Sequence, residues 1–370
     1  METPKALSAP KLTRRAALAG SAALLAAAAA PEEAPGLNTH AMRCNRFYGA
    51  AIDGRVLADD RPYTDVFPVE CGILTSEWGF KWHALRPKPD VYDFEQVDLL
   101  LTFAQKRSLQ VRGHTLLWHL DNPQWLEDTI TPANAESLLT AHIRTVASHC
   151  RNRVVHWDVV NEVLWPQDGK PLGLRDTIWS RALGPDALDI AFHACAETDG
   201  SPLRFINEYG LDYDWDADNR KREAMLALLS RLKARGVPVQ GLGIQAHLDA
   251  SVKALNQDKL AQFCADVASM GLKIVITELD VRDNNLPADT AVRDAAVASH
   301  AGAYLDVVLS NPAVLGVLTW GLSDRRSWLN DDLPRDDKLT QRALPLDVDL
   351  RRKPMWTTMA HAFDTAPVRA

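Results

Sequence analysis

The stretch VVHWDVVNE at residues 154–162 is an apolar, β-rich run that ends in an amide and a carboxylate side chain. Such a run predicts a strand. Amphipathic patterns lie on both sides of it, at residues 133–150 and 187–197, with apolar residues at three- and four-residue spacing. This spacing predicts helices. The local unit is therefore a strand flanked by helices.

The same alternation continues outward in both directions. Candidate strands lie at 47–52, 71–75, 109–115, 154–161, 203–207, 239–246, 273–278 and 314–320, and further helical patterns at 94–108, 217–235, 254–270 and 291–309. Strands that alternate with helices imply parallel pairing, in a barrel or a doubly wound sheet. Eight repeats in about 320 residues match a barrel, and no glycine-rich phosphate motif opens the first helix. We therefore expect an α/β fold with a single (β/α)8 TIM barrel over residues 46–365.

The first 30 residues have a different character. Lys5, Lys11, Arg14 and Arg15 precede an uncharged, alanine-rich run over residues 16–30. This pattern predicts an export signal, and the arginine pair before a weakly apolar run resembles the twin-arginine type. A membrane anchor is the alternative. We expect an exported protein, periplasmic or secreted, with a polar leader over residues 31–45.

Bulk composition limits the partners. The net charge of -7 argues against a nucleic-acid partner, since such binding depends on Lys and Arg neutralising phosphates. Eleven Trp against six Tyr suit a neutral sugar, because flat indole faces match the apolar faces of sugar rings. Five scattered cysteines form no C-x-x-C pair, so we expect no metal and no cofactor, and the odd count leaves at least one thiol unpaired.

The carboxyl ends of the strands carry the chemistry, because the active site of such a barrel lies there. Glu162 ends the fourth candidate strand and Glu278 the seventh, roughly opposite each other. Retaining cleavage of a glycosidic bond needs one carboxylic acid and one nucleophilic carboxylate about 5 to 5.5 Å apart. A single Glu at a strand end could equally be an ion-pair partner. The pair predicts Glu162 as acid/base and Glu278 as nucleophile.

Side chains at the neighbouring strand ends suit sugar binding. Asn161 can hydrogen-bond a sugar 2-OH, and His247 could orient Glu278. His114 and Lys81 offer donors to sugar hydroxyls on the non-reducing side. Trp320 and Trp328 could wall the pocket that holds the attacked ring.

Five runs of this chain are similar to the signatures of glycoside hydrolase family 10, the barrel endo-1,4-β-xylanases. They are VRGHTLLWH (111–119), WDVVNE (157–162), GIQAHL (243–248), ITELD (276–280) and WGLSD (320–324) followed by Ser327 and Trp328. The resemblance covers roughly residues 46–362. It implies endo-acting, retaining hydrolysis of β-1,4-xylosidic bonds in xylan. Independently of the resemblance, we expect a monomer, because the alanine-rich helices carry no obvious exposed apolar face. The resemblance also implies glycone subsites lined by Glu77, Lys81, His114, Trp118, Asn161, Gln245, His247, Trp320 and Trp328, with Tyr209 as an aromatic platform on the aglycone side.

Three positions depart from the family pattern. Trp78 stands where the family usually has Asn, Asp121 ends a Trp-His-Leu-Asp run where the family has Trp-His-Ser-Gln, and Gly210 replaces a common Asn. These departures predict an unchanged reaction with altered subsite preference, toward a substituted or shorter xylan. A β-glucanase and a non-catalytic xylan-binding protein are the alternatives, since one barrel can host several functions.

Overall fold

A computed structural model describes residues 35–252 and 255–369. The export signal predicted over residues 1–30 lies outside the described residues. One compact unit spans Pro35–Ala370. No helix in the described part is long and apolar enough to cross a membrane.

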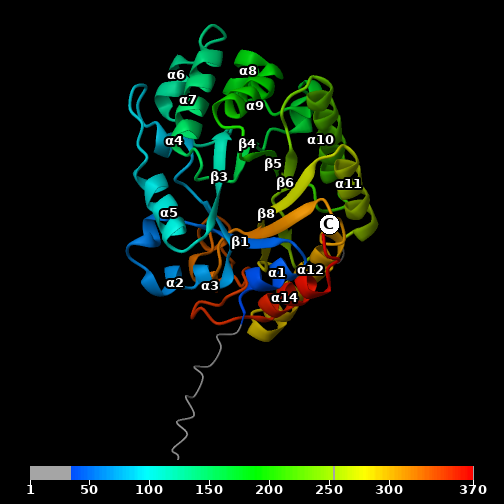
Figure 1. Ribbon diagram of the computed structural model, residues 1–370. Coiled ribbons are helices and arrows are strands. Elements are labelled where there is room, and N and C mark those ends of the chain that lie inside the picture. Colours follow the sequence, from blue (N-terminus) through cyan, green and yellow to red (C-terminus); the bar gives the residue numbers. More distant parts are fainter. Residues whose placement is uncertain (1–34, 253–254, 370) are drawn as a thin grey trace, which may run out of the picture. The chain divides into compact units, whose positions relative to one another are not determined.

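The centre of this unit is a closed barrel of eight parallel strands (Figure 1). Its strands are β1 (Phe47–Ile52), β2 (Ile73–Ser76), β3 (Gln110–Leu117), β4 (His156–Asn161), β5 (Leu203–Glu208), β6 (Gly241–Ile244), β8 (Lys273–Arg282) and β9 (Val314–Thr319). Each strand pairs with its neighbours in the order β6-β5-β4-β3-β2-β1-β9-β8, and β6 pairs with β8 to close the ring. The predicted (β/α)8 barrel is confirmed.

One predicted strand is divided. The run at 239–246 forms β6 only as far as Ile244, and a short strand β7 (His247–Asp249) follows and pairs with the end of β8. Ala246, between them, has a left-handed backbone with φ of 62°. Such a conformation interrupts a strand, because an extended residue needs a negative φ. The break turns His247 toward Asp280 on β8.

Helices form the outer layer, as Figure 1 shows for α5, α7, α9, α10 and α11 around the strands. The six predicted helices are present as α5 (Glu95–Lys106), α7 (Ala135–His149), α9 (Asp186–Thr198), α10 (Asp216–Ala234), α11 (Gln257–Ser269) and α12 (Thr290–Val308), and α14 (Pro354–Thr365) is a further long one. Their apolar stripes face inward. In α5, for example, Val97, Leu100, Leu101 and Ala104 are buried.

The unit begins earlier than the sequence analysis placed it. Residues predicted as a leader contain helix α1 (Leu37–Arg43), which packs against α14. Leu37 and Ala41, four residues apart on one face, are fully buried. A short helix with only two buried apolar side chains gives little periodic signal, and its burial depends on a partner more than 300 residues away.

Buried side chains fill the barrel itself. Ile73, Phe205, Val275 and Leu318 come from four different strands and pack together as one cluster, which places them in the barrel interior. Arg112 and Asp158 form an ion pair beside them, with the guanidinium over the ring of Phe205. The barrel is therefore a packed core that holds the strand ends in fixed positions.

Candidate active site

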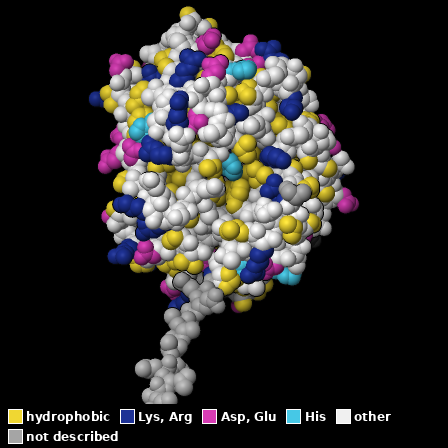
Figure 2. Space-filling model, in the orientation of Figure 1, with side chains coloured by type: hydrophobic (Ala, Val, Ile, Leu, Met, Phe, Trp, Pro, Cys, Tyr) yellow, Lys and Arg dark blue, Asp and Glu magenta, His cyan; other side chains and the backbone are white. Residues whose placement is uncertain are grey.

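The carboxyl ends of the strands bring the predicted site residues together. His114 lies on β3, Asn161 ends β4 with Glu162 next to it, Glu278 lies on β8, and Trp320 follows β9. Figure 2 shows a hollow near the centre of the visible face, with hydrophobic side chains and a histidine gathered in it. No group of three or more His, Cys, Asp or Glu side chains suited to a metal ion occurs among the described residues. The five cysteines are buried free thiols.

The predicted nucleophile, Glu278, is buried and held at both carboxylate oxygens. Asn207 Nδ2 donates to Oε1 at 2.6 Å, and His247 Nε2 lies 3.2 Å from Oε2. The other ring nitrogen of His247 lies 3.0 Å from Asp280 Oδ1. A protonated imidazole can donate to both carboxylates at once.

The charges at this position favour ionised side chains. Burial opposes a charged His247, but the charge of Asp280 and hydrogen bonds to Asp280 and Glu278 raise the pKa of His247 well above its usual value. Burial likewise acts against an ionised Glu278. The hydrogen bond from His247, the charges of His114 and His247 and the bond from Asn207 outweigh it and lower the pKa of Glu278. Glu278 is therefore held as a carboxylate at neutral pH.

The predicted acid/base residue, Glu162, has different partners. Trp118 Nε1 donates to Oε2 at 2.9 Å, and Gln245 Nε2 donates to Oε1 at 3.1 Å. His119 Nδ1 lies 3.9 Å from Oε2. Burial and the positive charges of Arg175 and Lys221 lower the pKa of His119 to about 4, so it is neutral at pH 7. Neither side-chain hydrogen-bond donor to Glu162 is charged.

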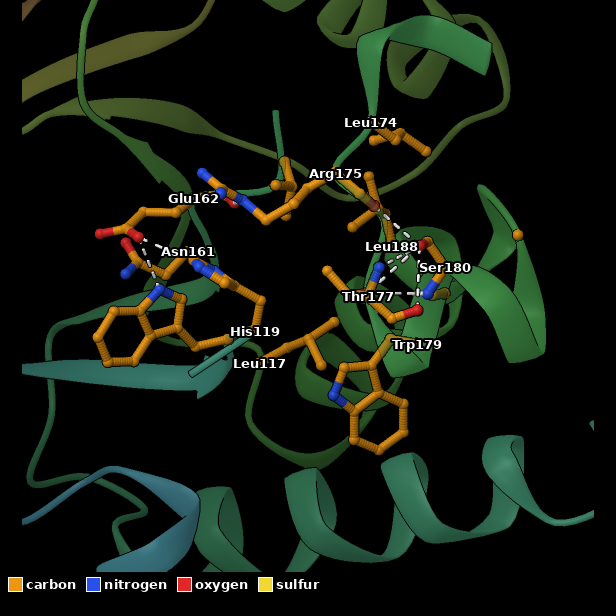
Figure 3. Close-up of a pocket in the computed structure, with 14 residues that line it drawn as sticks. Leu117, His119, Asn161, Glu162, Leu174, Arg175, Thr177, Trp179, Ser180 and Leu188 are labelled. Carbon is orange, nitrogen blue, oxygen red and sulfur yellow. Dashed lines mark hydrogen bonds and ion pairs between the residues drawn. The ribbon is translucent and has the colours of Figure 1, made fainter. Parts of the chain in front are cut away.

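A small cavity of about 40 Å³ lies beside Glu162. Figure 3 shows Glu162 and Asn161 at one side of it and Leu188, Thr177 and Trp179 at the other, with Arg175 extending toward Glu162. Most of the remaining lining is apolar, including Leu117, Val163 and Leu174. Glu162 therefore borders a small cavity with a largely apolar lining.

Three amide side chains connect the two carboxylates. Gln245 Nε2 lies 3.1 Å from Glu162 Oε1 and 3.3 Å from Asn161 Oδ1. Asn207 Nδ2 donates to the same oxygen of Asn161 at 2.9 Å and to Glu278. Thr277 Oγ1 donates to Asn207 Oδ1 at 2.7 Å and so fixes the orientation of that amide. The two carboxylates are therefore positioned relative to one another by a continuous hydrogen-bonded chain.

The glycone-side residues predicted from the sequence also have defined partners. His114 Nδ1 lies 3.1 Å from Asp158 Oδ2, and its ring packs edge-on against Trp320. Trp328 Nε1 donates to Asp280 Oδ2 at 2.7 Å. Asp280 therefore orients both His247 and Trp328, although it was not among the predicted site residues.

Glu77 and Lys81, both predicted on the glycone side, lie in different environments. Burial and the negative charge of Asp53 raise the pKa of Glu77 to about 8, so this carboxyl is mainly protonated at neutral pH. Lys81 is buried, and its Nζ lies 3.4 Å from Asp121 Oδ2. It also lies 4.1 Å from the ring centroid of Trp78 and 4.5 Å from that of Trp118.

Two of the three departures from the family pattern thus meet at Lys81. Trp78 and Asp121 are far apart in sequence, but both contact its ammonium group. Beyond Glu77 and Trp78 lies a polar cavity of about 360 Å³, whose lining includes Arg55, Arg326 and Trp328. The predicted glycone side therefore combines a lysine enclosed by two indole rings and a carboxylate with a cavity beyond Trp78.

Tyr209, the predicted aglycone platform, contacts two cationic side chains. Lys221 Nζ lies 3.4 Å from its ring centroid, and Arg175 donates to its hydroxyl at 3.0 Å. Lys221 also forms a buried ion pair of 2.7 Å with Glu208. The third departure, Gly210, has a φ of 64°. Glycine and asparagine are the residues that adopt this left-handed conformation most readily, so the backbone there suits either one.

The functional surroundings of the carboxylates were only partly predicted. Asn207, Asp280, Arg175 and His119 contact the site but were not among its predicted residues. Asn207 lay at a recognised strand end, which was the available signal. Arg175 lies in a loop without regular pattern, and nothing in the sequence around it indicates its contact with Glu162.

Comparisons with known proteins identify the family of this chain. Residues 36–362 match the model of the family described as glycosyl hydrolase family 10. The chain is 31% identical over 301 residues to endo-1,4-beta-xylanase B of Thermotoga neapolitana, which covers 81% of this chain and 83% of that protein. It is 30% identical to exoglucanase XynX of Acetivibrio thermocellus, covering 86% of this chain but only 29% of that longer protein.

A solved structure gives the same fold. The crystal structure of xylanase 10B from Thermotoga petrophila in complex with xylobiose superimposes with a TM-score of 0.82 at 29% identity, over 90% of this chain and 99% of that one. The family match covers more than four fifths of the sequence. The chain belongs to glycosyl hydrolase family 10.

Proposed function

We propose that this protein is a retaining endo-1,4-β-xylanase in which Glu162 is the acid/base and Glu278 the nucleophile. The observation that carries the proposal is the unequal environment of the two carboxylates. Charged and amide donors hold Glu278 ionised, whereas an indole and an amide contact Glu162. A double displacement requires this difference, since one group must attack while the other donates a proton.

In the first step, Glu278 attacks the anomeric carbon of a bound xylosyl residue. Glu162 transfers its proton to the glycosidic oxygen as the bond to the aglycone breaks, so the leaving sugar departs as a neutral alcohol. The Asn161 amide is oriented by Asn207 and Gln245. In this mechanism it hydrogen-bonds the sugar 2-OH, and this bond strengthens in the transition state.

In the second step, water replaces the aglycone. Glu162, now a carboxylate, removes a proton from this water, whose oxygen attacks the anomeric carbon and displaces Glu278. The product keeps the β configuration because the carbon is inverted twice. His247 stabilises the Glu278 carboxylate as it leaves.

Activity on β-glucan is the second candidate function, because one relative carries the name exoglucanase. Trp320 and Trp328 stand at the glycone pocket, and a glucosyl ring carries a hydroxymethyl group that xylose lacks. A clash of that group with a closed pocket is worth roughly 1–3 kcal/mol, or 10- to 200-fold in kcat/KM. We expect the purified chain to release oligosaccharides from xylan at least this much faster than from mixed-linkage β-glucan. Equal rates, or preference for the glucan, would overturn the xylanase assignment.

The glycone departures support a finer proposal on specificity. Lys81 is held by Asp121 and by two indole rings, so it is less free to donate to a second glycone sugar. We expect Trp78→Asn to increase activity on linear xylohexaose relative to branched xylan fragments. The ratio of the two kcat/KM values tests this, with Trp215→Asn as a surface control. An unchanged ratio would exclude Trp78 as a specificity determinant.

We also propose that the protein is exported, which the sequence of residues 1–30 supports, and that it is a monomer. Replacing Arg14 and Arg15 by Lys should retain the protein in the cytoplasm of its host, as measured by fractionation. Gel filtration of the purified chain should give the mass of one copy.

A further inference from the structure

The main chain of Glu162 has an unusual conformation. Its φ is 55°, in the left-handed region that residues with a side chain rarely adopt. The residue directly follows β4, so this turn decides where the carboxyl group lies. Such a conformation persists only where its surroundings fix it.

Two hydrogen bonds fix this backbone. The Glu162 N–H donates to the Asn207 carbonyl at 2.9 Å. On the other side of the residue, the Glu162 carbonyl accepts from Arg175 Nε at 3.0 Å. The first bond continues the pairing of β4 with β5, whereas the second comes from a side chain on a loop.

The same guanidinium reaches the aglycone platform. Arg175 Nη2 donates to the Tyr209 hydroxyl at 3.0 Å, and the guanidinium lies 5.0 Å from the ring centroid of Trp165. Within the described residues Arg175 forms no ion pair with a carboxylate. Its contacts are thus directed to the acid/base residue and to aromatic side chains rather than to a counter-ion.

The Arg175 backbone is itself held beside Glu162. Arg175 N donates to the Val163 carbonyl at 2.8 Å, and Trp165 N donates to the Gly173 carbonyl at 2.8 Å. Leu164 and Leu174 pair between them as an antiparallel bridge. The two segments therefore form a short ladder. Figure 3 shows that the Arg175 side chain extends toward Glu162.

We propose that Arg175 is a positioning residue that fixes the acid/base Glu162 and links its placement to the aglycone platform Tyr209. Arg175 does not transfer a proton. It holds the Glu162 main chain so that the carboxyl group meets the glycosidic oxygen, and it holds the tyrosine against which the leaving sugar rests. The inference rests on the proposed role of Glu162.

Leaving-group dependence tests this role. We expect Arg175→Met to lower kcat/KM roughly 100-fold on phenyl xylobioside, because small misplacements of a catalytic group have effects of this size. The kcat/KM on dinitrophenyl xylobioside should stay close to the wild-type value, because its leaving group needs no proton in the first step. A merely destabilised protein would lose activity on both substrates. Arg181→Met is the matched control, since Arg181 is exposed and, among the residues that the structure describes, forms its ion pair with Asp176.

Two conservative variants separate charge from geometry. Arg175→Lys keeps the positive charge but lacks the planar guanidinium whose separate nitrogens reach the Glu162 carbonyl and the Tyr209 hydroxyl. We therefore expect it to lose as much kcat/KM on phenyl xylobioside as Arg175→Met. Tyr209→Phe removes one acceptor of Arg175 but leaves the bond to the Glu162 carbonyl. Its kcat/KM on phenyl xylobioside, relative to that on dinitrophenyl xylobioside, should therefore fall less than that of Arg175→Met. Full activity of Arg175→Lys on phenyl xylobioside would show that charge alone matters and would overturn the proposal.

A double-mutant cycle distinguishes this inference from the proposed function. Glu162→Ala alone should show the leaving-group-selective loss, and if it does not, the proposed acid/base assignment fails first. In that background, Arg175→Met should have no further effect on phenyl xylobioside, because residues that act through one group are not additive. An equal loss with and without Glu162 would mean that Arg175 acts on the substrate directly.

Discussion

Replacing Asn207 should show how far the amide chain controls the nucleophile. Its Nδ2 group donates at 2.6 Å to Glu278 Oε1 and at 2.9 Å to Asn161 Oδ1, so Asn207→Ala removes both bonds. A hydrogen bond to a charged group contributes about 1.5–3 kcal/mol. If the transition state loses this stabilisation, kcat/KM falls roughly 10- to 150-fold.

The pH dependence gives the variant a specific signature. Asn207 is one of the groups that lower the pKa of Glu278, so without it the pKa of Glu278 rises. The acid limb of kcat/KM on an aryl xylobioside should therefore move to higher pH. Asn207→Asp should have a lower kcat/KM than Asn207→Ala at neutral pH, because a second carboxylate then faces Glu278. Its kcat/KM should recover partly on acidification.

Thr277→Val is the matched control for this experiment. It removes the hydroxyl that donates to Asn207 Oδ1 at 2.7 Å and touches neither carboxylate. A neutral hydrogen bond contributes about 0.5–1.5 kcal/mol, so a loss of roughly 2- to 10-fold is expected. An Asn207→Ala enzyme with an unshifted acid limb and a loss no larger than that of Thr277→Val would refute the reasoning.

Further predictions concern charge and pH. His247→Gln removes the charged donor at Glu278 Oε2, so the acid limb of kcat/KM should move to higher pH; an unmoved limb would mean that His247 is not protonated in the free enzyme. His156, buried inside the barrel, has its pKa lowered to about 3 by burial and the charge of Arg112. Between pH 6.5 and that value the unfolded chain binds a proton that the folded chain does not, so the free energy of unfolding falls as pH falls. Between pH 7 and pH 5 this lowers the free energy of unfolding by about 2 kcal/mol, and His156→Phe should abolish that decrease in urea unfolding measured at the two pH values. A decrease of the same size in His156→Phe and the wild type would show that His156 does not cause it.

The parts of the molecule that repeat were predictable from the sequence. Eight strands and six helices follow from hydrophobic periodicity, because each strand and helix buries one face in the same way. The positions of Glu162 and Glu278 follow from the fold itself, since the strand ends of a barrel meet at one mouth. Local pattern and topology are sufficient for these features.

The features that were missed depend on contacts between distant segments. Helix α1 is stable because α14 covers Leu37 and Ala41, and the division of β6 from β7 depends on a left-handed Ala246. The cage around Lys81 brings together Trp78 and Asp121, which are 43 positions apart in the sequence. Sequence comparison marked those two residues as unusual, but only the structure shows that they share one partner.

The most direct test of the central claim is the configuration of the first product. Proton NMR during hydrolysis of xylohexaose by the purified chain should show the β anomer first, followed by slow mutarotation, and Glu278→Ala should release no product. Initial formation of the α anomer would exclude the double displacement. Product release that survives the loss of Glu278 would show that another group is the nucleophile.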